Sequence, residues 1–280
     1  MNRSGAAVNR LLDLLEIERG DVVYLQSSFS RLKFLNTAPE AILTFILERL
    51  GPAGTLVLPS FAWHVVPEAR PWVGYAKYFR DRPVFDVRNT PANIGLLPEV
   101  FRRMPRTLRS THCCWSVSAV GQLSEVITSG HSVHPYSPES SFGLLATSGC
   151  QMVGLGVTLN TTSLAPVVDF TLGPAHTQQV FTPQPELGPV INHEGHVVQM
   201  ATYWLLPEVV RTIKPSVLFE LDDGLKRATR RADQGDAIMF SYPYKIYHDA
   251  AIAVGRESIA REDRMPWLVN YPTRAETQAP

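Results

Sequence analysis

Apolar residues in the first part of the chain form short continuous runs that alternate with a helical pattern. Residues 22–26 read as a buried strand, and residues 55–61 read as a second one. Between them, apolar positions at helical spacing predict a helix over residues 39–50 with one buried face. Because strand, helix and strand follow in this order, the pattern favours parallel strands that are covered by helices.

The same kind of pattern predicts further elements along the chain. They are an amphipathic helix over residues 8–17, a capped helix that starts near residues 90–91, a second capped helix in SPESSFGLLATSG, a third strand over residues 150–156, an antiparallel hairpin that turns at residues 194–195, and helices over residues 207–213 and 247–259. We expect one α/β domain over residues 1–270 and a frayed tail over residues 271–280. Its central sheet is mixed and mainly parallel, flanked by helices, with a late antiparallel hairpin.

Composition narrows the class of partner. Lysine and arginine together number 26, as do aspartate and glutamate, so the formal net charge is zero and favours neither nucleic acid nor an anionic membrane. No apolar run approaches the ~18 residues of a membrane span, and the charged N-terminus has no secretory-signal core. Three cysteines make no disulfide framework. We therefore expect a cytoplasmic protein without a nucleic-acid or membrane partner.

The segment LRSTHCCWSVSAVG, residues 108–121, concentrates reactive side chains. Four interpretations are open: a metal site, a thiol nucleophile, an acyl-transfer base, and a buried strand with one satisfied histidine. In a strand, successive side chains point to opposite faces, so His112, Cys113 and Cys114 would not all reach one metal ion. We therefore expect no metal. Either cysteine, with His112 as its base, is a candidate nucleophile; the alternative is that it fills core volume.

Several stretches occur in the order that is typical of one family. GDVVYLQSSFSRL runs from a strand into a Ser-Ser turn, GPAGTLVLPSF supplies the next strand, and FDVRNTPANIGLLPEVFRRMPRTLRSTH ends in Arg-Ser-x-His. WSVSAVG, ESSFGLL and QMVGLGVTLNTTSL follow. On these stretches the chain resembles the aminoglycoside 3-N-acetyltransferase family, best over residues 20–169. The resemblance implies an antibiotic N-acetyltransferase-like fold, distinct from the GNAT fold, and metal-free transfer of an acetyl group from acetyl-CoA to an amine.

The resemblance also implies roles for single residues. The candidate cofactor-binding residues are Ser27, Ser28, Phe29, Thr90 and Ser116. His112 matches the family's histidine and is the best catalytic candidate, either as a general base or as an orienting group. Its alternative is a core histidine bonded to a backbone carbonyl. Asp86, Glu139 and Trp63 are candidate contacts of the acceptor amine, with capping or aromatic packing as their alternatives.

The chain departs from the family pattern at two places. Cys113 follows His112 where the family usually has proline. A second family histidine, a leading candidate for the base, is missing, because its position falls on Ala165 or Pro166. Asp169 is a candidate to take over as base or to orient a histidine; if Pro166 opens a helix, Asp169 instead complements the helix dipole. His176 is a candidate substitute for the missing histidine.

These observations lead to one main prediction and two alternatives. The chain is predicted to be a CoA-dependent N-acyltransferase that moves an acetyl or other short acyl group to a small amine, such as an amino sugar, an aminoglycoside or a biosynthetic intermediate. The first alternative is an acyltransferase or condensing enzyme with a Cys113 or Cys114 acyl-enzyme. The second is a non-catalytic homologue that binds CoA or another ligand. The sequence leaves open whether the protein forms a homodimer. The remaining histidines in polar turns, His131, His134, His193 and His196, are expected to be solvated.

Overall fold

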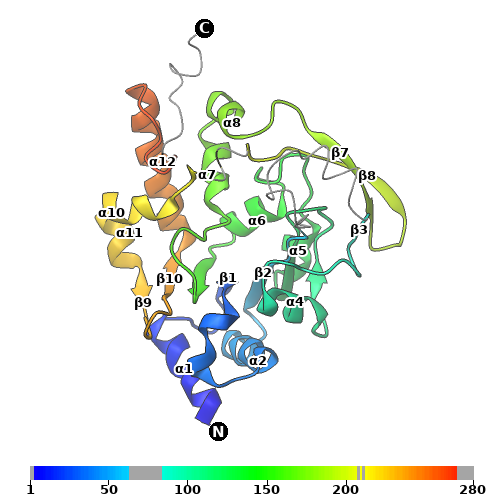
Figure 1. The fold of residues 1–280 in the computed structure, drawn as a ribbon, viewed down its shortest axis with the longest axis vertical. Helices are drawn as coiled ribbons and strands as arrows, with labels where there is room; N and C mark the ends of the chain where they lie inside the picture. Colours follow the sequence, from blue (N-terminus) through cyan, green and yellow to red (C-terminus); the bar gives the residue numbers. More distant parts are fainter. Residues whose placement is uncertain (1–2, 63–83, 207–208, 210–211, 270–280) are drawn as a thin grey trace.

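The main sheet has seven strands within the part of the chain that the computed structural model describes, residues 3–62, 84–206, 209 and 212–269 (Figure 1). In spatial order they are β4 (Leu108–Arg109), β5 (Val117–Gly121), β2 (Thr55–Pro59), β1 (Val22–Ser27), β6 (Gln151–Leu155), β10 (Met239–Pro243) and β9 (Arg230–Arg231). The strands predicted around residues 22–26, 55–61 and 150–156 are therefore the three central ones.

Parallel pairing is confined to the centre of this sheet. β1 pairs in parallel with β2 on one side and β6 on the other, whereas the pairs farther out are all antiparallel. The predicted mixed sheet is confirmed, and its parallel part coincides with the β-α-β pattern of the sequence. The antiparallel strands β5 and β10 have five residues each, as β2 and β6 do, so strand length does not indicate the direction of pairing.

Side chains alternate between the two faces of the main sheet, and each face has its own buried core. In β1, Val23 and Leu25 enter one core and Tyr24 enters the other. The first core is covered by α1 (Arg3–Leu14), α2 (Pro39–Leu50) and α4 (Leu96–Arg103), with the 3-10 helices η1 (Phe29–Arg31) and η2 (Lys33–Leu35) between β1 and α2. This alternation, with a period of two residues, buries β1 on both faces.

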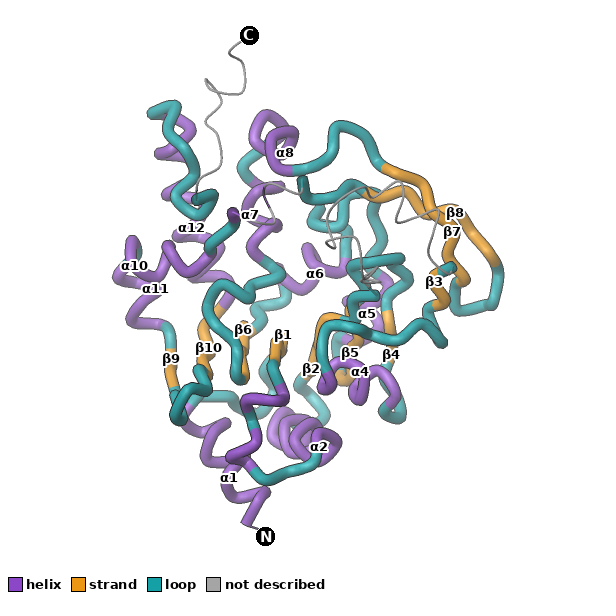
Figure 2. The backbone as a smooth tube through the Cα atoms, viewed as in Figure 1, coloured by secondary structure: helices purple, strands orange, loops and turns teal. Residues whose placement is uncertain are grey.

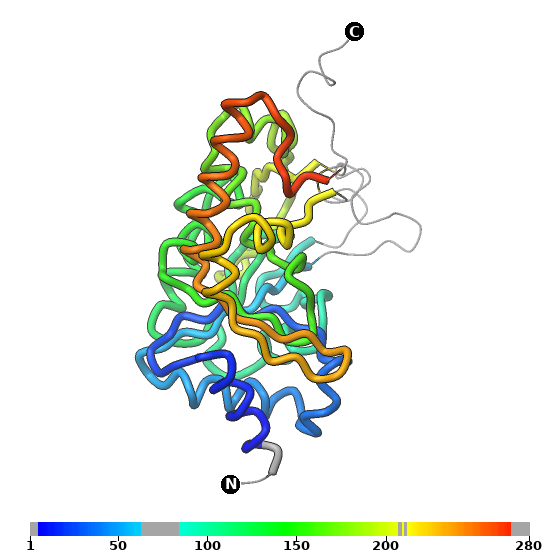
Figure 3. The backbone as a smooth tube through the Cα atoms, turned by 90° about the vertical axis from the view of Figure 1, so that its left-hand side faces the viewer, coloured from blue at the N-terminus to red at the C-terminus, as the bar shows by residue number. Residues whose placement is uncertain are grey.

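The second core lies under a larger set of helices. They are α5 (Ser124–Ser129), α6 (Ser141–Thr147), α7 (Ala165–Thr171), α8 (Pro174–Val180), α10 (Leu218–Leu221), α11 (Asp223–Ala228) and α12 (Tyr244–Ala260), with η3 (Pro215–Val217) leading into α10. Figure 3 looks onto the side of the molecule where α10, α11 and α12 pack beside β9 and β10. None of the helices in the described ranges is long and apolar enough to cross a membrane.

A second, three-stranded sheet lies apart from the main one (Figure 2). β3 (Phe85–Asp86) runs parallel to β7 (Glu186–Ile191), and β7 forms an antiparallel hairpin with β8 (Val197–Thr202). The hairpin predicted to turn at residues 194–195 is confirmed. Gly195 has a positive φ of 83°, and the Asn192 Oδ1 atom accepts hydrogen bonds from the backbone N–H groups of Glu194 and His196.

Some predicted elements differ from the structure. α4 begins at Leu96, not near Thr90, because the Thr90 hydroxyl accepts a 2.8 Å hydrogen bond from the Asp86 N–H while the Thr90 N–H donates to the Asp86 carbonyl. This turn and Gly95, with a φ of 141°, delay the helix. Residues 112–114 lie in the segment between β4 and β5, in which residues 113–115 form a turn, rather than in a strand. The predicted tail over residues 271–280 and most of the helix over 207–213 fall outside the described residues.

Candidate active site

The candidate site is built on the edge of the main sheet where its parallel strands end. β1 ends at Ser27, and Ser60 follows the last residue of β2. The antiparallel β5 starts at this same edge, since Val117 pairs with Pro59. β1 is also the strand from which the sheet extends in both directions, towards β2 and towards β6. Crevices outside the carboxyl ends of strands at such a switch point are where open α/β sheets bind ligands.

Ser27, Ser28 and Phe29 lie at this switch point, as expected from the sequence. The Ser28 N–H donates to the Leu155 carbonyl of β6 at 2.9 Å, which holds the turn against the neighbouring strand. The Ser27 Oγ atom is buried and has no hydrogen-bond partner among the described residues. Phe29 packs against the first core. Ser27 and Ser28 thus place polar atoms at the end of β1, and Phe29 contributes apolar packing.

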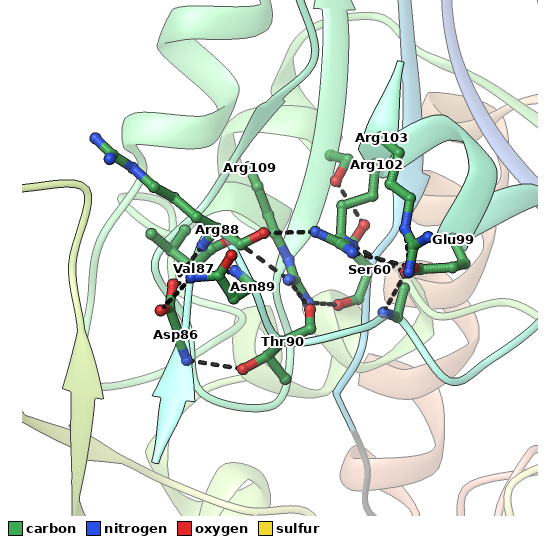
Figure 4. Close-up of polar contacts among 12 residues, drawn as sticks. Ser60, Asp86, Val87, Arg88, Asn89, Thr90, Glu99, Arg102, Arg103 and Arg109 are labelled. Atoms are coloured by element: carbon green, nitrogen blue, oxygen red, sulfur yellow. Dashed lines mark hydrogen bonds and ion pairs between the residues drawn. The ribbon is translucent and has the colours of Figure 1, made fainter. Parts of the chain in front are cut away.

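Asp86, the last residue of β3, and Thr90 belong to the turn in which β3 ends (Figure 4). The Asp86 carboxylate accepts hydrogen bonds from the Arg88 N–H at 2.8 Å, the Asn89 N–H at 3.1 Å and the Asn89 side chain at 2.8 Å. Burial raises the pKa of Asp86, but these bonds outweigh it, and the pKa lies below its usual value. The Asp86 carboxylate, which was predicted to contact the acceptor amine, is therefore occupied by hydrogen bonds to its neighbours in the chain.

Arg109 joins this loop to the sheet, and the sequence interpretation did not single it out. Its side chain is 4% exposed. The guanidinium donates to the Ser60 carbonyl at 2.6 Å, to the Ser116 hydroxyl at 3.1 Å and to the Thr90 carbonyl (Figure 4). It also lies 4.9 Å from the centre of the Phe85 ring. The only sequence signal for this residue was its place in the Arg-Ser-x-His stretch.

A second charged group lies beside Arg109, on α4. The Glu99 carboxylate accepts from the Ala92 N–H at 2.7 Å and forms ion pairs with Arg102 and Arg103 at 2.8 and 2.5 Å (Figure 4). Burial raises its pKa, but the hydrogen bonds from Arg102 and Ala92 and the charges of both arginines lower it to about 2. Glu99 is therefore ionised near neutral pH and is fully engaged by its neighbours.

His112 is held at both ring nitrogens. Nδ1 accepts from the backbone N–H groups of Cys114 and Trp115 at 3.3 and 3.0 Å, which leaves Nε2 as the protonated nitrogen. Nε2 lies 3.2 Å from the Thr202 hydroxyl at the end of β8. Since an acceptor nitrogen is what a general base requires, this arrangement suits an orienting group better. The side chains of Cys113 and Cys114 are both 0% exposed.

Asp169 and His176 meet in the second core. Their side chains, 0% and 5% exposed, lie 2.8 Å apart between Oδ1 and Nε2, and the Trp267 indole N–H donates to the same oxygen at 3.2 Å. Asp169 Oδ2 is buried without a hydrogen-bond partner in the described part of the chain. The alternative in which Asp169 complements the α7 dipole is wrong, because Asp169 lies beyond the first turn of α7.

The remaining predicted residues are more dispersed. Ser116 is buried at the main sheet edge and donates to the Ser60 carbonyl at 2.6 Å. Glu139 is exposed just before α6, and Trp63 lies outside the described residues. Among the described residues, no group of three or more His, Cys, Asp or Glu side chains is placed to hold a metal ion. Ser27 and Ser28 thus lie at the sheet edge where Arg109 ties Thr90 and Ser116 to Ser60, whereas Asp169 lies with His176 in the second core.

One histidine prediction was wrong. His131, His193 and His196 are exposed as expected, whereas His134 is buried beside Phe170 and Phe181. His193 also donates from Nε2 to the Arg109 carbonyl at 2.8 Å. Together with the His112–Thr202 contact, this bond ties the β7–β8 hairpin to the segment between β4 and β5.

Comparison with known proteins identifies the family of this chain. The family model described as aminoglycoside 3-N-acetyltransferase matches residues 25–219. The chain belongs to the aminoglycoside 3-N-acetyltransferase family. One curated relative, aminoglycoside N(3)-acetyltransferase IX of Micromonospora chalcea, is 28% identical over 179 residues, which cover 59% of this chain and 62% of the relative. Another, aminoglycoside N(3)-acetyltransferase IV of a Salmonella species, is 29% identical over 157 residues, covering 55% of this chain and 54% of the relative.

Solved structures of family members have the same fold over most of the chain. Aminoglycoside acetyltransferase AAC(3)-Xa superposes with a TM-score of 0.74 at 20% identity, covering 96% of each chain. The apoenzyme of AAC(3)-IVa superposes with a TM-score of 0.68 at 22% identity, covering 92% of this chain and 90% of that one. The sequence matches to the two curated relatives span less than two thirds of their lengths, whereas the fold extends through the C-terminal elements.

Proposed function

We propose that this protein transfers an acetyl group from acetyl-CoA to the amine of a small molecule such as an aminoglycoside, an amino sugar or a biosynthetic intermediate. The observation that carries the proposal is the gathering of Ser27, Ser28, Thr90 and Ser116 at the carboxyl edge of β1 and β2, in a chain that belongs to this family. Two solved neighbours support the substrate classes: AAC-IIIb is described as a binary complex with CoASH, and AAC-VIa as bound to sisomicin.

The serine turn after β1 is the proposed contact for the coenzyme. Ser27 has a buried hydroxyl whose hydrogen-bonding capacity is unused among the described residues, and the half-buried Ser28 has its hydroxyl 3.2 Å from that of Ser30. Amide and phosphate groups of a coenzyme are partners that such hydroxyls and strand-end N–H groups accommodate. Phe29 and Thr90 are proposed to shape the same site.

Two histidines are proposed for the chemical step, in different roles. His112 is supported as an orienting group, because its Nδ1 is occupied by two backbone N–H groups. His176 is proposed as the base: its Nε2–H donates to Asp169, which leaves Nδ1 to accept a proton. Because this side chain is 5% exposed in the second core, the role requires the acceptor amine to reach Nδ1 there. On this proposal the base removes one proton from the acceptor ammonium and the amine attacks the thioester carbon. The C–S bond then breaks, and the second proton on nitrogen passes to the departing CoA thiolate.

The two alternatives make different demands. An acyl-enzyme at Cys113 or Cys114 requires a thiol that the donor can reach, and both side chains are buried. A non-catalytic homologue would bind acetyl-CoA without turnover. Turnover without a covalent acyl adduct separates direct acyl transfer from both alternatives.

The test begins with the donor. Titration of the purified protein with acetyl-CoA is expected to give saturable binding and a raised melting temperature. A panel of amines, with thiol release as the readout, then identifies the acceptor class. Absence of acetyl-CoA binding would rule out the proposal. Binding without thiol release from any amine would favour the binding module, and a stable acyl adduct in intact-mass spectra would favour the cysteine route.

Variants then assign the histidine roles. His176→Asn is expected to lower kcat at least about 100-fold, as loss of a general base does. His112→Asn, whose side-chain oxygen can replace Nδ1 as the acceptor for the Trp115 N–H, is expected to retain part of the activity. If His112→Asn abolishes acetyl transfer and His176→Asn retains it, the two roles are assigned wrongly. A pH–rate profile of each variant identifies which histidine titrates in the reaction.

A further inference from the structure

Arg109 occupies the centre of the candidate site and pairs with no carboxylate among the residues that the structure describes. Its donors go to the carbonyl oxygens of Ser60, Val87 and Thr90 and to the Ser116 hydroxyl (Figure 4). These partners come from the end of β2, the loop after β3 and the start of β5. One planar side chain therefore fixes the positions of three separate segments relative to one another.

The charge on Arg109 is balanced only at a distance. No acidic side chain of the described residues lies within ion-pair distance of its guanidinium. Among the charges that act on it, that of Arg102 opposes its charged form, and those of Glu99 and Asp86 favour it. Both carboxylates are engaged by other donors, as described above. Burial lowers the pKa of Arg109 to about 9, so the group stays charged at neutral pH.

Connecting loops through a buried cation costs desolvation free energy. Removing a charge from water costs several kcal/mol, and neutral donors would bind the same carbonyl oxygens at lower cost. The desolvation cost of such a buried charge is offset only where the charge stabilises another group or a ligand. The ligand proposed for this edge of the sheet is acyl-CoA. Its phosphates are negatively charged, and its CoA part departs as a thiolate.

We propose that Arg109 is a positioning residue for the acyl-CoA site: its guanidinium aligns the Thr90 loop with Ser116 at the ends of β1 and β2, and its charge favours the anionic donor. This inference rests on the proposed function. Arg109 acts through its neighbours and through its field, since its hydrogen bonds to Ser60, Val87, Thr90 and Ser116 are all internal to the protein. Lysine is a poor replacement, because a single ammonium cannot reproduce the planar fork that reaches several carbonyls.

The experiment compares Arg109→Lys and Arg109→Met with a matched control, Arg49→Met. Arg49 lies on α2 and also donates to backbone carbonyls, those of Asn9 and Ile17, and pairs with Asp13 at 2.7 Å. Each variant is measured for its free energy of unfolding in urea, its Kd for CoA, and its KM and kcat with two donors. The donors are acetyl-CoA and S-acetylpantetheine, which lacks the phosphates.

The expected result separates positioning from general stability. Arg109→Met should raise the KM for acetyl-CoA by about tenfold or more, which corresponds to about 1.4 kcal/mol. The rise should be smaller for S-acetylpantetheine, and the KM for the acceptor should change little. Arg109→Lys should recover the preference for the phosphorylated donor but not the full kcat. Arg49→Met should lower stability without changing either KM.

Other outcomes overturn the inference in distinguishable ways. Equal effects of Arg109→Met and Arg49→Met on KM would make Arg109 a purely structural tie. Equal losses with both donors in Arg109→Met would remove the role of its charge. If Arg109→Met does not fold, unchanged donor KM and kcat in Arg109→Lys would exclude the requirement for the planar fork. A wild-type protein that binds no CoA would instead defeat the proposed function itself.

Discussion

At the scale of single residues, burial gives His134 a chemistry that its sequence position does not indicate. Its Nδ1 accepts from the Tyr136 N–H at 3.4 Å, while Nε2 is buried with no hydrogen-bond partner in the described ranges. The rings of Phe170 and Phe181 lie 4.5 and 4.3 Å from it, centre to centre. Because burial disfavours the imidazolium form, it lowers the pKa of His134 to about 4.

This lowered pKa predicts an acid-sensitive contribution to stability. The unfolded chain takes up the proton near pH 6.5 and the folded protein only near pH 4, so stability falls as pH decreases through that window. In His134→Phe the fall between pH 7 and pH 5 should be smaller by about 1–2 kcal/mol. Urea unfolding at both pH values measures the difference. The exposed His196→Phe variant is the control, and identical pH dependence in His134→Phe and wild type would contradict the assignment.

At the scale of elements, a buried polar cluster joins three parts of the chain. Asp169 of α7 binds His176 of α8 and Trp267, which follows α12. Figure 1 shows α7 between α8 and α12. Packing of apolar helix faces tolerates small shifts, whereas two hydrogen bonds to one carboxylate oxygen require a specific geometry. The cluster therefore fixes how these helices and the C-terminal segment are placed.

Breaking this cluster is expected to be costly. Asp169→Ala leaves the His176 and Trp267 donors buried without their acceptor, and the loss should be about 3–5 kcal/mol in the free energy of unfolding. Asp169→Asn, which can keep an oxygen acceptor, should lose less stability but still lower kcat if His176 is the base. Asp249→Ala removes an exposed pair with Lys245 on α12 and should cost less than about 1 kcal/mol. Equal losses in Asp169→Ala and Asp249→Ala would argue against the cluster's role.

At the scale of the whole molecule, the main sheet interleaves distant parts of the chain. Its centre is β1, β2 and β6, and β10, near the C-terminus, pairs directly with β6. The Ser241 hydroxyl of β10 donates to the Leu15 carbonyl after α1, which links residues 226 positions apart. No cut between the N-terminal and C-terminal halves would leave both cores intact.

We therefore predict that residues 1–270 behave as one domain. Calorimetric unfolding should give a single transition whose calorimetric and van't Hoff enthalpies agree. Acetyl-CoA should shift that transition as a whole, because a ligand that binds only the folded state stabilises every part that unfolds with it. Two resolved transitions, with only one moved by acetyl-CoA, would show that the C-terminal elements form a separate domain.

Much of the fold was predictable because local patterns carry local information. The strands around residues 22–26, 55–61 and 150–156, the helix over residues 39–50 and the hairpin turning at residues 194–195 follow from apolar spacing and turn residues. The start of α4 was not predictable, because it depends on the bonds between Thr90 and Asp86 and on the backbone of Gly95.

The sequence by itself determined the family, the parallel centre of the sheet and the Ser27–Ser28 turn at the end of β1, since motif order and periodicity are properties of neighbouring residues. Only the tertiary structure decided which distant groups meet. It occupied both nitrogens of His112, one of them near Thr202, 90 positions away, and it paired Asp169 with His176. It also made Arg109 the link between three segments. These contacts depend on how the sheet and hairpin pack, which no local pattern records.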